Sequence, residues 1–172
     1  RYAEPKSFNL FIAAISRVSG EQRNGVQFLL KLLETIVDRT AEILERSVAG
    51  IDQLSAGIFG SQARVKRKAP RFLEDRLGDI ASYHRLLSKE RDSLMSLSRL
   101  QTFLFSVPAI QQDKDAKELC RSIGRDIPSL SEHASFISGN LSFLLDASLG
   151  LINVEQNAII KIFSIASVVF LP

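Results

Sequence analysis

The sequence contains one cysteine, two histidines and no tryptophan in 172 residues. A single cysteine, Cys120, cannot form a disulfide within the chain, and it also excludes a zinc ribbon or a CxxC redox site. Two histidines, His84 and His133, are too few for a multi-histidine metal centre, and we expect both to be partly buried structural residues. Glycine-rich phosphate loops, HExxH and GxSxG are also missing. The sequence therefore predicts that this chain is not an enzyme.

Charged residues are scarce in the last 46 residues. Up to residue 126 the chain has 21 basic and 16 acidic residues, whereas residues 127–172 hold only Glu132, Asp146, Glu155 and Lys161. The net charge of +3 is too small to indicate nucleic acid as a partner. With 45% hydrophobic residues the composition is that of a folded chain, but its two parts are suited to different surroundings.

Apolar residues recur every three or four positions along almost the whole chain, which predicts an all-α fold. A first helix is expected over residues 7–19. Two long amphipathic helices are expected over residues 24–59 and 72–106, joined by the basic connector 62–71. Helices of matched length with a short connector should fold back as a long antiparallel hairpin.

A very long stalk helix is expected after the hairpin, with the hairpin packed on it. A charged helix over residues 111–123 leads into it, and Asp126 with Pro128 looks like a helix start, with Asp126 as the N-cap. The alternative is a kink within one continuous helix. No strong turn signal follows before Pro172.

The stalk helix carries two stripes of side chains. A first, apolar stripe, here called the packing stripe, should pack against the hairpin or a neighbouring copy; it comprises Leu130, Ala134, Ile137, Leu141, Leu144, Ser148 and Leu151. The second, here called the polar stripe, comprises Asp146, Gly150, Asn153, Asn157, Ile160, Ser164, Ser167 and Leu171. Small polar residues on an otherwise apolar helix suit a water-filled axis surrounded by copies of that helix. A buried helix interface that uses small residues for close approach is the alternative.

The run from Ile162 to Leu171 is apolar and about half the length of roughly 20 residues that a membrane span needs. We expect a membrane helix that begins here and continues beyond Pro172.

The stretch GLINVEQNAIIKIFSIASVVFLP, residues 150–172, resembles the end of the stalk helix and the start of the first membrane span of CorA magnesium transporters. The opening RYAEP resembles the end of that family's cytoplasmic sheet. The resemblance implies a homopentamer in the inner (plasma) membrane of a prokaryote, with this segment on the cytoplasmic side. It further implies that the N-terminal α/β domain, the Gly-Met-Asn motif and the two complete spans lie outside these residues.

The resemblance also implies an organisation in four parts. Residues 1–20 would be the end of the α/β domain with a short helix, and residues 21–106 the antiparallel hairpin. Residues 107–161 would be the stalk with its charged lead-in, and residues 162–172 the start of the first membrane span. The function implied is to line the cytoplasmic pore and to couple Mg²⁺ sensing to gating.

Individual positions of the polar stripe acquire roles through the same resemblance. Asn157 corresponds to a polar ring near the cytoplasmic membrane face, and Asp146 to an acidic ring deeper in the funnel. Ile160 and Leu171 fall where the family has hydrophobic gating constrictions. Asp126 is the nearest candidate for an early-stalk ligand of regulatory Mg²⁺, and Asp146 is the second candidate metal residue. Co²⁺ is a second candidate for the transported ion.

Two other interpretations remain at this point. The Leu-rich patterns alone are compatible with a soluble helical-bundle scaffold that oligomerises through its apolar seams. A zinc or cobalt transporter of the same superfamily is the other alternative.

Overall fold

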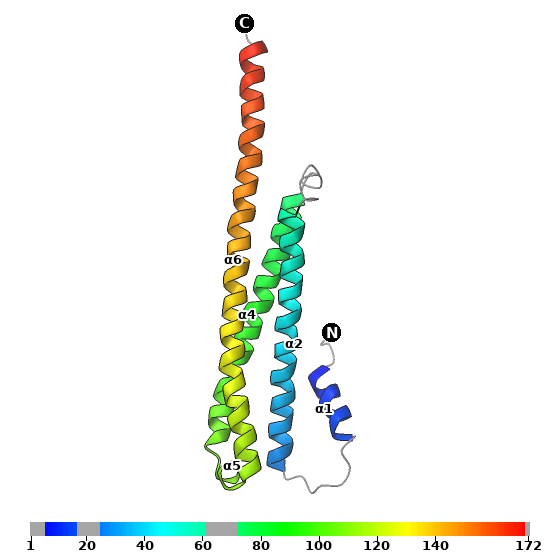
Figure 1. The fold of residues 1–172 in the computed structure, drawn as a ribbon, viewed down its shortest axis with the longest axis vertical. Coiled ribbons are helices and arrows are strands. Elements are labelled where there is room, and N and C mark those ends of the chain that lie inside the picture. Colours follow the sequence, from blue (N-terminus) through cyan, green and yellow to red (C-terminus); the bar gives the residue numbers. More distant parts are fainter. Residues whose placement is uncertain (1–5, 17–24, 61–71, 171–172) are drawn as a thin grey trace. The chain divides into compact units, whose positions relative to one another are not determined.

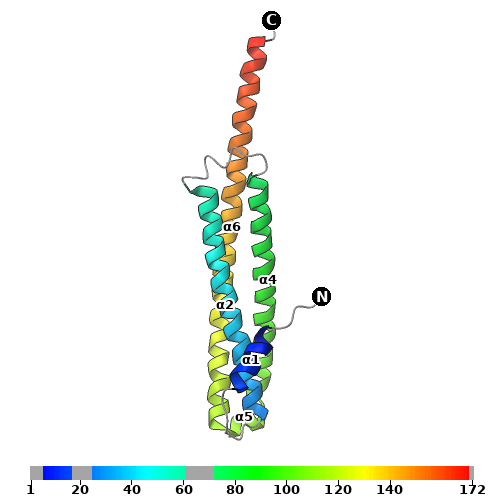
Figure 2. The ribbon, with the colours of Figure 1, turned by 90° about the vertical axis from the view of Figure 1, so that its right-hand side faces the viewer.

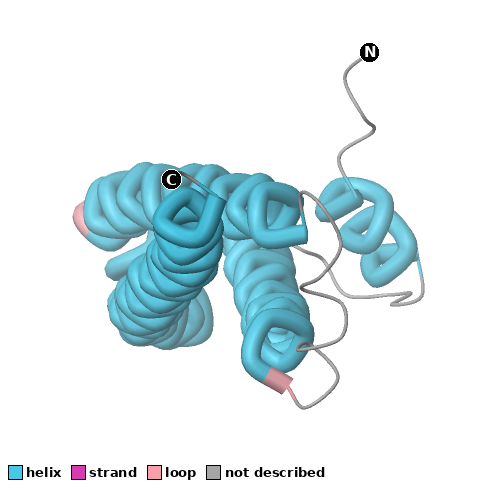
Figure 3. Tube along the Cα trace, turned by 90° about the horizontal axis from the view of Figure 1, so that it is seen from above, coloured by secondary structure: helices cyan, strands magenta, loops and turns pink. Residues whose placement is uncertain are grey.

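The computed structural model describes residues 6–16, 25–60 and 72–170. Nearly all of these residues are helical, as Figure 3 shows, and the described residues include no strand. The helices are α1 (Lys6–Ser16), α2 (Gly25–Phe59), α4 (Phe72–Phe105), α5 (Pro108–Gln112) and α6 (Lys114–Phe170), labelled in Figure 1. The prediction of an all-α chain with a hairpin and a very long C-terminal helix is confirmed. The expected strand tail at residues 1–5 and the basic connector lie outside the described residues.

The chain divides into two compact units. Unit 1 comprises Arg1–Ser47 with Leu87–Phe136, and unit 2 comprises Val48–Leu86 with Ile137–Pro172. Each unit contains a portion of α2, α4 and α6, because these three helices are continuous through both. In unit 1 the α2 and α4 portions run antiparallel, with α6 beside them and α1 against α2 (Figures 1 and 2).

The core of unit 1 is built from the apolar faces of its helices. Phe11 of α1 is buried, and its ring meets Phe28 of α2 edge to face at a centroid distance of 4.7 Å. The other buried side chains of this core are Leu30, Leu33, Val37, Leu44, Leu87, Leu94, Leu104, Ile110, Ala116, Cys120, Ile123, Ile127 and Ala134. Thr40 and Ser47 are also buried, and their hydroxyls donate hydrogen bonds to the carbonyls of the residues four positions earlier, at 3.1 and 2.9 Å. Small hydroxyl side chains therefore complete a face on which the sequence pattern showed only apolar residues.

The core of unit 2 joins the second half of the hairpin to α6. Its buried side chains are Ile51, Leu54, Ile58, Leu73, Ile80, Ile137, Leu141, Leu144 and Ser148. A side chain at Gly50 would collide with the ring and hydroxyl of Tyr83, so α2 and α4 approach closely here because residue 50 is glycine.

Helix α6 begins at Lys114, and its N-cap is Asp113. The Oδ1 atom of Asp113 accepts hydrogen bonds from the backbone amides of Asp115, at 3.0 Å, and Ala116, at 3.1 Å. Gln27 of α2 donates to the Oδ2 atom at 3.2 Å. The Ala116 amide is the main group that holds the pKa of Asp113 below its usual value, and the Gln27 and Asp115 donors add to this.

The predicted helix start at Asp126 is therefore wrong, and the alternative of one continuous helix is correct: Pro128 lies inside α6. Proline lacks an N–H, so the Gly124 carbonyl loses its usual donor. Ile123 and Ile127 are both buried on this stretch, and their packing favours continuing the helix past the proline. The separate charged helix expected over residues 111–123 is instead the short α5 followed by the first turns of α6.

Leu94 and Met95 provide a matched test of the unit 1 core. Leu94 is fully buried and Met95 is exposed, on the same turn of α4. Leu94→Ala should lower the free energy of unfolding by about 2–5 kcal/mol, because it removes buried methyl groups and leaves a cavity. Met95→Ala should change it by less than about 1 kcal/mol. Urea denaturation followed by circular dichroism measures both, and equal losses would contradict this core.

Candidate functional site

The packing stripe of α6 faces the chain's own helices. In unit 2, Ile137, Leu141, Leu144 and Ser148 are all buried. The Ser148 hydroxyl donates to the Leu144 carbonyl at 2.6 Å, so this polar group is satisfied within the helix. The stripe therefore packs within the chain, against the hairpin portion of its own unit.

The polar stripe lies on the opposite side of α6. At 3.6 residues per turn, Asp146 points about 160° away from Ser148. Every described member of the stripe is exposed: Asp146, Gly150, Asn153, Asn157, Ile160, Ser164 and Ser167. Leu171 lies outside the described residues. The structure thus brings these side chains onto one face, and the described part of the chain leaves that face uncovered.

The polar stripe presents oxygen atoms to whatever lies beyond it. Asn153 and Asn157 offer amide oxygens and Asp146 a carboxylate, a donor set that suits a hard, hydrated cation such as Mg²⁺. In residues 6–16, 25–60 and 72–170, no three His, Cys, Asp or Glu side chains come together to hold a metal ion. One copy contributes one carboxylate to this stripe, so a cation site here would need several copies of α6.

The C-terminal end of α6 has the composition of a membrane helix. Among the described helices, α6 is long and apolar enough to cross a membrane. Its mean hydropathy is 1.4 over a stretch of 18 residues. In unit 2 this end of the helix extends past the ends of α2 and α4 (Figure 1). Ile162, Phe163, Ile165 and Val168 are all exposed there. Exposed apolar side chains in such numbers are typical of a surface that meets a partner or a membrane.

Asp126 lies on α6 in unit 1 and acts electrostatically on Asp38 of α2. Partial burial raises the pKa of the Asp38 carboxyl, and the carboxylates of Glu34 and Asp126 raise it further, against the opposing effect of Lys31. The structure therefore brings Asp126 towards acidic residues that the sequence analysis did not select. The sequence did contain a pattern that indicates this acidic face: Glu34, Asp38 and Glu42 recur every four residues along α2.

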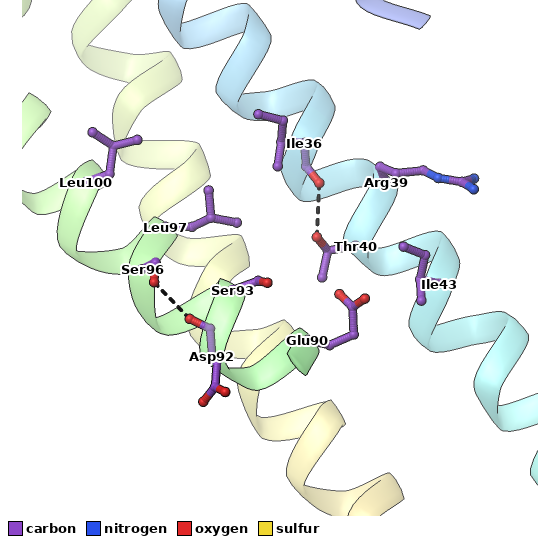
Figure 4. Close-up of a pocket in the computed structure, with 10 residues that line it drawn as sticks. All are labelled: Ile36, Arg39, Thr40, Ile43, Glu90, Asp92, Ser93, Ser96, Leu97 and Leu100. Atoms are coloured by element: carbon purple, nitrogen blue, oxygen red, sulfur yellow. Dashed lines mark hydrogen bonds between the residues drawn. The ribbon is translucent and has the colours of Figure 1, made fainter. Parts of the chain in front are cut away.

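A groove of about 600 Å³ runs between α2 and α4 in unit 1 (Figure 4). Its walls are mostly apolar, and its lining residues are Ile36, Arg39, Thr40, Ile43, Glu90, Asp92, Ser93, Ser96, Leu97 and Leu100. Figure 4 shows the Glu90 carboxylate pointing from α4 towards α2. Burial raises the pKa of this carboxyl. The sequence pattern gave no indication of the groove, which contains none of the predicted pore residues.

The two histidines and the single cysteine lie in described helices, and none of them belongs to a group of metal-ligating side chains there. His84 and His133 are exposed, so the prediction that they are partly buried is wrong. Both lie just outside the apolar faces of their helices. Cys120 is fully buried, and burial raises the pKa of its thiol although a hydrogen bond with Gln101 acts in the opposite direction. A thiol of raised pKa is a poor nucleophile.

Comparison with known proteins gives a match over the whole chain. A family model described as CorA-like Mg²⁺ transporter protein matches residues 1–172. The magnesium transport protein CorA of Escherichia coli is 35% identical over 173 residues, which cover 100% of this chain and 52% of that protein. The protein of the same description from Mannheimia succiniciproducens is 33% identical over 153 residues, covering 88% and 46%.

The fold is also similar to a solved structure, that of the complete CorA magnesium transporter from Methanocaldococcus jannaschii. The TM-score is 0.78 at 18% sequence identity, over 98% of this chain and 51% of that one. The chain thus spans about half the length of the relatives that it matches.

The Glu90 carboxyl gives a pH-dependent prediction. Because its pKa is raised in the folded chain, ionising Glu90 opposes folding, and this cost is present only above its unfolded pKa of about 4.3. Glu90→Gln should therefore increase the free energy of unfolding at about pH 7 relative to the unmodified chain. The gain in free energy should disappear at about pH 3.5, where the Glu90 carboxyl is protonated in both the folded and the unfolded unmodified chain.

Urea titrations at the two pH values measure this difference. Asp92→Asn is the matched control, since Asp92 lines the same groove but is exposed. A gain for Glu90→Gln that is equally large at both pH values would contradict burial of the charge as its cause.

Proposed function

Because this chain belongs to the CorA-like Mg²⁺ transporter family, we propose that it is the cytoplasmic helical and stalk region of a divalent-cation channel or transporter. The observation that carries the proposal is the exposed polar stripe of α6, which continues into an apolar helix end of membrane-spanning composition. Copies of α6 arranged around an axis would turn this stripe into the lining of a water-filled pore. We propose five copies, as the family resemblance implies.

The parts of the chain then have separate tasks. Residues 1–20 close a preceding cytoplasmic domain, and residues 21–106 form a hairpin that supports the stalk. Residues 107–161 form the stalk with its lead-in, and residues 162–172 enter the inner membrane of a prokaryotic cell, with the rest of this segment in the cytoplasm. Support comes from the mostly unburied apolar end of α6, which follows directly on the polar stripe.

Asp146 is proposed to concentrate cations at the cytoplasmic end of the pore. Carboxylates repeated around an axis produce a strongly negative potential that attracts divalent cations. Asn153 and Asn157 lie two and three turns further along α6 and would contact the hydration shell of the ion. Mg²⁺ gives up its water reluctantly, so amide oxygens that bind its waters suit it better than a dry cage. Gly150, Ser164 and Ser167 complete the narrow polar path.

Ile160 and Leu171 are proposed as hydrophobic constrictions. Ile160 lies on the polar stripe and is 60% exposed, so it interrupts the polar path with an apolar side chain. A ring of such side chains would repel water and close the path until the helices move apart. Leu171, 11 residues further along the chain, would act in the same way.

Asp126 is proposed to take part in regulation by Mg²⁺. Its carboxylate already raises the pKa of Asp38, so these negative charges oppose one another across α2 and α6. Since the described residues of one chain bring no three metal-ligating side chains together, a divalent cation bound here would need further ligands from a neighbouring copy. Bound in this way it would neutralise the repulsion, and its loss would restore it. This provides a physical link between the cytoplasmic Mg²⁺ concentration and the stalk.

The alternative of a soluble scaffold leaves the apolar end of α6 unexplained, whereas a membrane transporter accounts for it. Mg²⁺ is the proposed substrate because the family description and the relatives name it. Co²⁺ is proposed as a second substrate of the same pore.

Asp146→Asn in the full-length gene product should reduce Mg²⁺ flux about tenfold at low Mg²⁺, because the variant loses the negative potential that concentrates the ion. The defect should shrink as Mg²⁺ is raised to saturation. Flux into proteoliposomes, read with a Mg²⁺-sensitive dye, measures both conditions. Glu155→Gln is the control, since Glu155 is half-buried on another face of α6. Unchanged flux of Asp146→Asn at low Mg²⁺ would sink the proposed role.

Asp126→Asn should weaken the effect of Mg²⁺ on the stalk. We expect Mg²⁺ to protect the unmodified protein from limited proteolysis, and the variant to need a several-fold higher concentration for the same protection. Glu132→Gln, an exposed charge change further along α6, should behave like the unmodified protein. Identical Mg²⁺ dependence of Asp126→Asn and the unmodified protein would argue against a regulatory site there.

A further inference from the structure

Pro128 weakens one turn of α6 within unit 1. The residue lies inside the helix, and proline has no amide hydrogen to donate to the carbonyl of Gly124. The proline ring also crowds that carbonyl, and sharp bends in helices occur mostly at prolines. Residues 124–128, here called the hinge turn, have therefore lost a backbone hydrogen bond that the neighbouring turns of an α-helix keep.

A side chain of α4 reaches the main chain of α6 one turn before the hinge turn. The Nε2 atom of Gln101 donates a hydrogen bond to the Cys120 carbonyl at 2.9 Å. In an α-helix the Gly124 amide donates to that same carbonyl, so the oxygen takes a second donor on its other lone pair. Cys120 is fully buried, and its thiol donates to the Gln101 carbonyl at 3.9 Å. These two contacts, here called the clasp, join α4 to α6.

Gly124 provides the space that the clasp occupies. A β-carbon at this position would stand 2.5 Å from Nε2 and 2.9 Å from Cδ of Gln101, so it would displace the amide group. Glycine weakens a helix interior relative to alanine, and at residue 124 it allows the contact with Gln101. Gly139 lies in the same helix, and there is open space within 4 Å of where its β-carbon would stand. Alanine would therefore interfere with the clasp at residue 124 and meet nothing at residue 139.

The other contacts of this stretch of α6 are of a different kind. Ile123 and Ile127 are buried in the core of unit 1 and hold one face of the helix without direction-specific bonds. On the outer face, Arg125 lies 3.8 Å from Glu118, and both side chains are more than 60% exposed, so the ion pair contributes little. In the part of the chain that the structure describes, Gln101 makes the one side-chain hydrogen bond from α4 to the main chain of α6.

We propose that residues 124–128 form a hinge in α6 and that Gln101 is the positioning residue that holds this hinge closed. Pro128 removes a backbone hydrogen bond from the hinge turn, and Gln101 supplies one from a neighbouring helix to the turn before it. This hinge does not depend on the proposed transport function, because all of its contacts lie within unit 1. Asp126 lies on the hinge turn, so the effect of its carboxylate on Asp38 of α2 depends on the closed hinge.

Hydrogen exchange of the full-length gene product in detergent micelles, followed by mass spectrometry of its peptides, tests the hinge. Gln101→Met keeps the length of the side chain and removes the amide donor. We expect exchange of the amides in residues 121–131 to become about fivefold faster, as for the loss of one net hydrogen bond. Exchange in residues 30–47 of α2 should stay unchanged, because opening of the hinge leaves that helix in place. An equal acceleration in both segments would indicate a general loss of stability and overturn the hinge.

Pro128→Ala returns the missing N–H to the hinge turn. Added to Gln101→Met, it should bring exchange in residues 121–131 back to the rate of the unmodified protein or below, because the Gly124 carbonyl regains its donor. If exchange in the double variant is as fast as in Gln101→Met alone, Pro128 is not the origin of the opening and the proposal fails. Gln101 is half-buried, so Gln101→Leu takes the place of Gln101→Met if the methionine variant does not fold.

A pair of glycine variants tests the clasp itself. In a Gly124→Ala background the Gln101 amide has already lost its place, so Gln101→Met should change exchange in residues 121–131 by less than about twofold. In the matched Gly139→Ala background the clasp is intact, and the fivefold effect of Gln101→Met should persist. An effect of the same size in both backgrounds would show that Gln101 acts without the contact at Gly124 and would overturn the clasp.

Discussion

The fold depends on the way in which α6 divides its surface. One face is committed to the chain's own core through Ile137, Leu141, Leu144 and Ser148, while the opposite face has no partner in the described residues. Burying the first face fixes the rotation of the helix about its axis. That rotation in turn decides that Asp146, Asn153 and Asn157 point outward together, so the packing of the hairpin sets the geometry of the proposed pore.

Continuity of α6 is the second requirement, because its buried face, its exposed polar stripe and its apolar end belong to one element only if the helix is unbroken. The helix begins at a well-made cap, where Asp113 accepts two backbone hydrogen bonds and one from Gln27. It then passes through Pro128, with Ile123 and Ile127 buried on the preceding turns. The local sequence favours a helix start here, but burial of the apolar face favours one continuous helix. Burying several apolar side chains stabilises the fold by more free energy than the loss of one backbone hydrogen bond costs.

Charged residues are distributed differently in unit 1 and in the later part of α6. In unit 1, acidic residues of α2 and α6 come close enough for Asp126 to add to the effects of burial and Glu34, which raise the pKa of Asp38. Further along α6 the charges are few, and Asp146 is the one charged residue between Ile137 and Val154. The scarcity of charge in the last 46 residues accompanies an exposed, apolar end of α6 that has the length and composition of a membrane helix.

The helices, the hairpin and the two stripes could be predicted from the sequence because apolar periodicity is a local property of each helix. Leu30, Leu44 and Leu94 are buried where that periodicity places them. What the sequence could not determine depends on residues far apart in the chain: the cap at Asp113 completed by Gln27, the approach of Asp126 to Asp38, and the groove beside Glu90. Only tertiary packing brings those residues together, and it also decided that one stripe of α6 is buried while the other stays exposed.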